Sequence, residues 1–507
     1  MTHPDSNLFP SSKNNPRQNI LKHPFVWTAT TYFAEGLPYS IVRQISSVFL
    51  KDHQATLQAI GLTSLYGLSW TLKFLWAPFI EKFGTKRTWA CLMQALLAVL
   101  AFAMAFASAL TQALQIVSVL FFIMAVLSAT NDIATDGYYM EALDKPGQAR
   151  FLGHRVMGYR LALIAGFGGI SLLVDKTSWF VGFGVLGIML ALAALFHYIF
   201  LPKAEEKAIP IKILWSWMLS GKRILFFFYA VSAIISLLWL LKSDIVRDLT
   251  APLQPYTDRV STSGWIALAL LFFLLCLLVA LRPMKQWATR SESLFGQTFV
   301  SFLDQPKIIS ILLFIVLYRA GESLLSAMSA PFILDMGISK SMLGIISGTI
   351  GTICSIVGTI LGGWLVSRFD LARTIWPITI IQNITNLVYM SMAYRFSELI
   401  GNPGPDSVNI LLVGGVHALD QLAGGMGTSV FVTFLMRACK EDHKASHFAI
   451  VSGLMTVCGT LMGAVSGFIA ASIGYALFFG ISFLASIPGM ILICYIPFLS
   501  SDTKPGA

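Results

Sequence analysis

Three carboxylates inside long apolar stretches are the side chains best placed to carry protons. Glu35 lies three residues before Pro38, which removes a backbone hydrogen bond and weakens the local helix. Asp132 and Asp136 lie four residues apart in another apolar stretch and therefore share one helix face. Inside a membrane such a charge costs at least about 2.5–3.5 kcal/mol and needs a partner or a role. We predict that all three couple protons to function; a buried, permanently protonated Glu35 is the structural alternative.

Two arginines are placed to compensate the two aspartates. Arg155 and Arg160 lie in the next apolar stretch, which must run back antiparallel to the stretch of Asp132 and Asp136. The rise per residue of a helix brings Asp132 level with Arg160 and Asp136 level with Arg155. The sequence therefore predicts two ion pairs that clamp neighbouring helices. A purely structural clamp and a role in binding remain open, and a clamp that opens during a conformational change would satisfy both.

Further polar side chains inside apolar stretches of both halves of the chain indicate a wet central cavity. Lys73 could extend to the membrane surface, pair with Asp136 or face an anionic ligand. The side chains predicted to line a substrate-binding cavity are Tyr32, Arg43, Lys73, Arg160, Arg319, Glu322, Gln382, Asn386, Asp420 and Gln421.

The composition shows which elements must position these residues. The 507-residue chain is 56% hydrophobic and 12% charged, whereas a soluble protein is about 25% charged. About 20 apolar residues suffice for a helix to cross a bilayer. The apolar runs are continuous rather than alternating, which excludes a β-barrel. The six cysteines are scattered without a CxxC pair, so no zinc site or disulfide framework is expected. The fold class predicted is an all-α polytopic membrane protein, without a cofactor.

Continuous apolar runs predict about fourteen membrane spans. Twelve of them form two groups, and the two at 223–242 and 263–282 are inserted between the groups. The predicted organisation is an N-terminal tail, a six-helix bundle, a linker with the inserted pair, a second six-helix bundle and a C-terminal tail, at residues 1–23, 24–201, 202–306, 307–498 and 499–507.

Lysine and arginine are concentrated in alternate loops, as the positive-inside rule expects of cytoplasmic loops. This pattern predicts that both termini lie in the cytoplasm. It also explains the net charge of +10 without a nucleic-acid partner.

The two six-helix groups repeat each other. The segment Tyr32-Phe33-Ala34-Glu35-Gly36 in the first span parallels Tyr318-Arg319-Ala320-Gly321-Glu322 in the seventh core span. Parallel six-helix repeats around a midplane site are one way in which secondary transporters are built.

Several of these motifs together resemble the major facilitator superfamily, and more narrowly its branch of AmpG-type muropeptide permeases and acetyl-CoA transporters. The resemblance rests on the segments 32–38, 73–78 and 129–138 and on Gly158-Tyr159-Arg160. It implies a major-facilitator fold and proton-driven import across the bacterial inner membrane, with anhydro-muropeptides as the best-known bacterial substrate. It also implies a cytoplasmic gate motif, which this chain carries as Glu81, Lys82, Lys86 and Arg87, with Arg368 and Arg373 in the second half.

The solute is open at this point, and acetyl-CoA, another nucleotide conjugate or an oligosaccharide are alternatives. A membrane-embedded enzyme would need a clustered nucleophile or metal set, which the sequence lacks. A transport-dead sensor that docks a partner on residues 223–282 is a third class. The expected partners are a small-molecule substrate, protons and membrane lipid, and we expect a monomer.

Overall fold

The computed structural model describes residues 20–73, 76–143, 145–203, 210, 300–397, 408–440 and 444–499, and within these ranges it is helical without a β-strand. The predicted inserted helices 223–242 and 263–282 lie outside the described residues. So do most of the linker and nearly all of the two predicted tails.

Every apolar run predicted in the N-terminal half (residues 20–203) coincides with a helix or with a row of short helices. These are η1 (Ile20–Lys22), α1 (Pro24–Ser40), η2 (Ile41–Ile45) and α2 (Ser46–Asp52); α3 (Leu57–Leu62), η3 (Thr63–Gly67), α4 (Leu68–Leu72) and α5 (Ala77–Lys82); α6 (Lys86–Ser108); α7 (Ala113–Ala142); α8 (Lys145–Leu163), η5 (Ile164–Gly169) and α9 (Ile170–Lys176); and α10 (Trp179–Phe200).

The six core runs predicted in the C-terminal half (residues 300–499) are also helical. They are α17 (Ile308–Leu317) and α18 (Ala320–Asp335); α19 (Lys340–Leu343), η7 (Gly344–Gly351) and α20 (Thr352–Phe369); α21 (Leu371–Arg395); α22 (Ile410–Arg437); and α23 (Lys444–Leu492). The range of α23 contains two predicted runs. The chain turns between them at Gly474, which has a φ of 77°.

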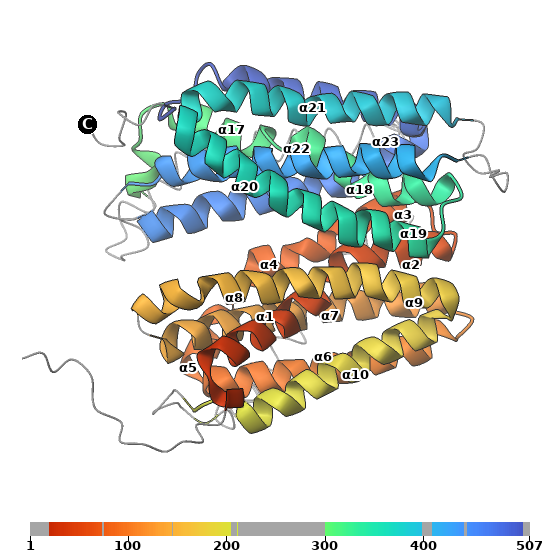
Figure 1. Cartoon of the computed structure of the whole chain (residues 1–507), viewed down its shortest axis with the longest axis vertical. Helices are drawn as coiled ribbons and strands as arrows, with labels where there is room; N and C mark the ends of the chain where they lie inside the picture. Colours follow the sequence, from red (N-terminus) through yellow and green to blue (C-terminus); the bar gives the residue numbers. More distant parts are fainter. Residues whose placement is uncertain are drawn as a thin grey trace, which may run out of the picture.

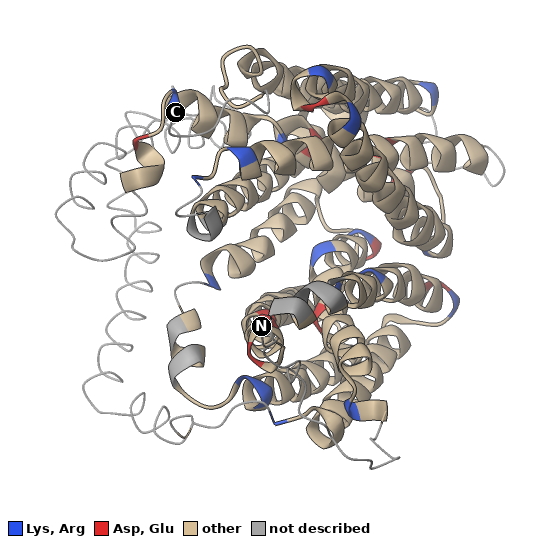
Figure 2. Cartoon of the chain, turned by 60° about the vertical axis from the view of Figure 1, so that its left-hand side comes forward, with Lys and Arg blue, Asp and Glu red and all other residues tan. Residues whose placement is uncertain are grey.

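The helices are suited to a membrane by length and composition. Seven helices among the described residues are long and apolar enough to cross a bilayer. Figure 2 shows long helical stretches that carry few charged residues. The total of fourteen spans stays a prediction.

Several helices are interrupted close to the predicted site residues. The first span changes to a π-helical turn at Ile41–Ile45, just after Pro38, and the seventh core span breaks at Arg319 between α17 and α18. Further π-helical segments occupy η5 and η7. Because π-helical turns occur frequently at functional sites, these interruptions favour a functional rather than a purely structural role for the region.

The two halves lie beside each other, with the N-terminal half in red to yellow and the C-terminal half in green to blue in Figure 1. Within the halves the closest neighbours include α6 with α10, α1 with α8, and α20 with α22. Between the halves, α3 and η3 pack against α23, η5 packs against η7, and α9 packs against α19. Smaller contacts join α2 with α18 and α4 with α23. The contacts that α2 and α9 make with α18 and α19 lie at one end of the molecule, which we call the closed end (Figure 1).

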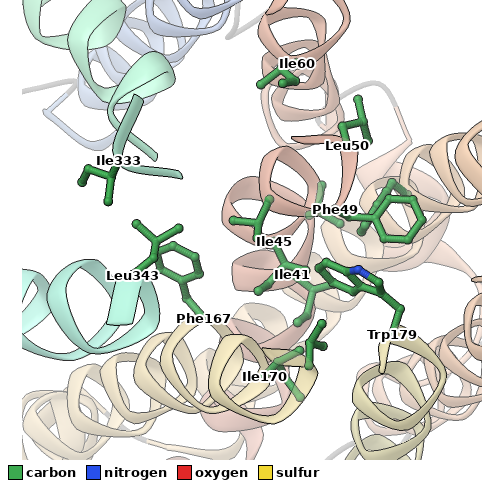
Figure 3. Packing of buried hydrophobic residues seen from close by; sticks show 14 of the residues in the cluster. Ile41, Ile45, Phe49, Leu50, Ile60, Phe167, Ile170, Trp179, Ile333 and Leu343 are labelled. Atoms are coloured by element: carbon green, nitrogen blue, oxygen red, sulfur yellow. The ribbon is translucent and has the colours of Figure 1, made fainter. Parts of the chain in front are cut away.

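Apolar packing seals the closed end. One buried cluster contains Ile41 and Phe167 from the N-terminal half together with Ile333 and Leu343 from the C-terminal half. Figure 3 shows Leu343 of the C-terminal half beside Phe167 of the N-terminal half, with Ile333 and Ile41 on the two sides of the boundary. Since burial of apolar surface stabilises by about 25 cal/mol per Å², this cluster favours the state in which the closed end is shut.

Ion pairs join the halves at the same end. Lys51 lies 2.6 Å from the carboxylate of Asp335, and Lys340 lies 2.8 Å from the carboxylate of Asp52. The indole of Trp179 also donates to Asp52, and the hydroxyl of Tyr475 donates to Asp335. We call Lys51, Asp52, Asp335 and Lys340 the inter-half bridge; none of the four is among the residues that the sequence singled out.

The crossing of α20 and α22 depends on glycine. A Cβ atom at Gly425 would lie 2.3 Å from the carbonyl oxygen of Ser355. We therefore expect Gly425→Ala to push the helices apart and to lower the free energy of unfolding by about 1–3 kcal/mol. Thermal unfolding of the purified protein in detergent measures this effect. Gly415→Ala on the same helix is the control, because its Cβ would meet nothing within 4 Å; equal melting temperatures for the two variants would contradict the prediction.

Candidate functional site

Charged and aromatic side chains from the first, second, fourth and fifth core spans gather inside the N-terminal half. We call them the acidic cluster, and its members are Tyr32, Glu35, Lys73, Asp132, Asp136 and Arg155. The helices α1, α7 and α8 each supply part of it, and Lys73 follows the end of α4.

Asp136 is paired with Arg155, which is the pairing that the helix depths predict. The guanidinium lies 2.8 Å from the carboxylate, and the hydroxyl of Tyr32 donates to the same oxygen over 2.6 Å. Arg155 also lies 4.4 Å from the centre of the Tyr32 ring, a favourable cation–π distance. The side chains of Asp136 and Arg155 keep 30% and 34% of their surface exposed. This ion pair is therefore partly exposed and not enclosed by protein atoms on all sides.

Asp132 pairs with Lys73 and not with Arg160, which corrects the second predicted ion pair. Equal depth is not sufficient for a contact, because the side chains must also face the right way. At 3.6 residues per turn, the side chains of Asp132 and Asp136 point in directions only about 40° apart around their helix axis. Those of Arg155 and Arg160 point about 140° apart around theirs. Only one of the two arginines can therefore face the aspartates, and the second span supplies the other cation.

Glu35 is the carboxyl group of the cluster without a cation of its own. It is 6% exposed, it interacts with Asp132, and its Oε2 atom has no hydrogen-bond partner. Three carboxyl groups thus share two cations, Lys73 and Arg155. Binding one proton is the simplest way to balance the charge of this cluster.

A second polar group lies in the C-terminal half, at the break between α17 and α18. Arg319 donates to Glu322 over 2.9 Å, and the amide of Gln382 donates to the same carboxylate over 2.5 Å. The side chains of Arg319 and Glu322 keep 28% and 21% of their surface exposed. The structure thus places a partly accessible charged group in each half.

Other residues predicted to line the cavity lie inside the helix packing. Asn386 accepts from Ser482, and Asp420 accepts from Thr385 and from its neighbour Gln421. Asn386 and Asp420 are buried within the C-terminal half, so in this conformation they stabilise that half rather than face a ligand. Tyr32 is likewise buried behind Asp136.

Arg43 and Arg160 are not part of the acidic cluster. Arg43 donates to the carbonyl oxygen of Ser64 over 2.9 Å and lies beside Thr460 of the C-terminal half. Arg160 is half-buried next to Tyr159, and it forms no ion pair among the described residues. The two arginines can therefore bind an anionic group of a ligand beside the acidic cluster, but they do not balance its carboxylates.

In the predicted gate motif, Lys86 and Arg87 contact helices of their own half. Lys86 lies 3.2 Å from Glu141 at the end of α7, and Arg87 donates to the carbonyl oxygens of Tyr198 and Leu201 at the end of α10. Arg368 and Arg373 are exposed, and the side chains of Glu81 and Lys82 lie outside the description. The inter-half bridge lies at the opposite end of α10, so the gating role of the motif stays a prediction.

No group of His, Cys, Asp and Glu that could hold a metal ion occurs among the described residues. The arrangement can instead exchange protons and bind charged groups of a ligand between two helical halves. These are properties of a carrier.

Comparison with known proteins decides the family. The sequence model of the Major Facilitator Superfamily matches residues 28–400. The chain belongs to this superfamily. The anhydromuropeptide permease of Escherichia coli K12 is 26% identical over 468 residues, which cover 91% of this chain and 77% of the permease. As a member of the superfamily with permeases among its relatives, the protein is a membrane transporter and not an enzyme.

Solved structures of other transporters share the fold. The peptide transporter POT, solved in complex with sulfate, superposes with a TM-score of 0.59 at 13% identity, and the match covers 93% of this chain and 94% of that chain. The nucleoside transporter NupG superposes with a TM-score of 0.51 at 13% identity, and the match covers 93% of this chain and 98% of the NupG chain. One fold thus serves peptides and nucleosides, so the substrate must be argued from the side chains of the site.

Proposed function

We propose that the protein is a proton-coupled importer of cell-wall muropeptides of the anhydro type, working as a monomer in the bacterial inner membrane. The observation that carries the proposal is the acidic cluster, in which three carboxyl groups share two cations inside an apolar half, and in which Asp136 is partly exposed while Glu35 is buried. The similarity to a permease for anhydromuropeptides favours this solute class over acetyl-CoA.

The sidedness follows from the charges of the loops. With both termini in the cytoplasm, the first span ends outside the cell at Lys51 and Asp52. With this orientation the closed end would face outward, and the structure would correspond to a state that is shut on the outer side. The predicted bundles at 24–201 and 307–498 would rock about the site to expose it to the other side.

Protonation can drive this exchange because it changes the charge of the cluster. A proton on Glu35 removes its repulsion with Asp132 and leaves two balanced ion pairs. Removing the unpaired negative charge lowers the free-energy cost of excluding water from the cluster, so protonation favours a state in which the cluster is enclosed. Coupling needs only that the proton and the solute each bind the two states with different affinities.

The solute would bind between the charged groups of the two halves. Muropeptides carry carboxylates on their peptide, and Arg319, Arg43 and Arg160 are cations that can face them. Arginine binds carboxylates with two parallel hydrogen bonds, which gives orientation as well as attraction. The inserted helices are not needed for this site.

Uptake of labelled anhydro-muropeptide into proteoliposomes under an imposed inward proton gradient tests the proposal. We expect accumulation that collapses when a proton ionophore removes the gradient. Unlabelled muropeptide should compete with the label, and acetyl-CoA should not. Gradient-independent flux would reject proton coupling, competition by acetyl-CoA would reassign the solute, and absence of any flux would favour a sensor.

A further inference from the structure

A layer of aromatic side chains lies next to the acidic cluster and takes no part in its ion pairs. Tyr39 of α1 meets Trp70 of α4 edge to face, with ring centroids 5.0 Å apart, and lies 5.8 Å from the ring of Tyr159 of α8. All three are half-buried. Within the described part of the chain no hydrogen bond occupies the two hydroxyls or the indole N–H. We call these residues the aromatic layer.

Charged residues of the first span lie beside the layer. Glu35, Tyr39 and Arg43 follow one another at four-residue spacing and therefore lie near one face of the first span. A Cβ atom at Gly36, the chain neighbour of Glu35, would lie 3.1 Å from the ring of Tyr159. The layer therefore adjoins the part of the first span that carries an acid and a cation.

The layer also begins where the halves touch. A Cβ atom at Gly67 would lie 2.5 Å from the guanidinium of Arg43 and 3.0 Å from the hydroxyl of Thr460 in α23. Trp70 follows Gly67 by three residues, on the same face of the second span. The aromatic layer is therefore about one helical turn away from a contact between the halves.

We propose that Tyr39, Trp70 and Tyr159 form a subsite for the amino-sugar part of the solute. A pyranose ring has apolar C–H faces and a rim of hydroxyl and amide groups. The faces can stack on the aromatic rings, while the rim reaches the ring-edge hydroxyls and indole N–H, which still need partners. Arg43, which lies beside the layer, adds a charged donor to this set of hydrogen-bonding groups. This inference rests on the proposed function, because it concerns the same muropeptide.

Three ligands separate the sugar subsite from the rest of the site. They are the intact anhydro-muropeptide, its amino-sugar disaccharide without the peptide, and the free peptide. We expect Trp70→Ala to weaken binding of the first two by roughly threefold to tenfold and to leave the free peptide unaffected. Trp70→Phe keeps a ring and should retain most of the affinity. Isothermal titration of the full-length protein in detergent measures all three ligands.

Controls keep the outcomes distinct. Trp364→Ala removes an aromatic ring that is 56% exposed on α20, far from the layer in sequence, and should change no affinity. Tyr39→Ala is a second variant if Trp70→Ala does not fold. Equal disaccharide affinity in the wild type and in the alanine variants, or an equal loss for disaccharide and free peptide, would overturn the sugar subsite. A wild-type protein that binds the free peptide but neither sugar ligand would overturn it as well. Failure of the wild type to bind any of the three ligands would instead overturn the muropeptide assignment.

Discussion

Glu35→Gln is expected to abolish gradient-driven accumulation of the solute while leaving exchange of labelled for unlabelled solute within a few-fold of wild type. Glutamine has the shape of glutamate but cannot release or accept a proton at the atom where the carboxylate does. Because Glu35 is the carboxyl group without its own cation, its replacement removes the coupled proton and leaves both ion pairs of the cluster in place. Accumulation in proteoliposomes should fall by about tenfold or more.

The two assays on the same vesicles separate coupling from binding. Asp175→Asn is the matched control, because Asp175 is an exposed carboxylate of the same half, at the end of α9. It should transport as wild type does. Full gradient-driven accumulation by the Glu35→Gln protein would show that another group carries the proton, and loss of exchange as well would assign Glu35 to solute binding.

Lys51→Glu is expected to shift the protein away from the state that is shut at the closed end. The substitution puts two carboxylates opposite each other in place of the pair that Lys51 forms with Asp335. The pair is only partly exposed, at 19% and 21% of its side-chain surfaces. Allowing for solvent screening, replacement of attraction by repulsion should change the ratio of the two states about fivefold to thirtyfold.

Distances between spin labels at Thr177 and Ser472 report this shift, since these exposed residues lie at the closed end of the two halves. The distribution should move to longer distances in Lys51→Glu and return in the double variant Lys51→Glu/Asp335→Lys. Lys176→Glu, a reversal of an exposed lysine at the same end, should leave it unchanged. A distribution unaffected by Lys51→Glu would mean that the apolar cluster alone holds this end shut.

Apolar runs were sufficient to place the helices of the twelve core spans. The fourth core span, for example, is one continuous helix over Ala113–Ala142. Runs are informative because a bilayer-spanning helix must be apolar over its length. They do not reveal interruptions, so the π-helical turn at Ile41–Ile45 and the break at Arg319 were not predicted. Their position depends on packing between helices that are distant in sequence.

An ion pair of the site was predictable where two side chains match both in depth along their helices and in direction around the helix axes. Asp136 and Arg155 satisfy both conditions, whereas Arg160 satisfies only depth. A count of rotation as well as rise would have shown from the sequence that only one of Arg155 and Arg160 can face the aspartates, and the structure shows that it is Arg155. The same count would have found the stripe of Glu35, Tyr39 and Arg43. The inter-half bridge could not be predicted, because charges at the ends of spans are ordinary and their partners depend on how the halves dock.

The apolar cluster at the closed end also bears on how well the membrane stays energised. Its side chains Ile41, Phe167, Ile333 and Leu343 have no atom that can take up or hand on a proton. In the proposed proton-coupled cycle, these apolar side chains would not relay a proton that arrives at the closed end. They would thereby limit proton leakage through molecules that carry no solute.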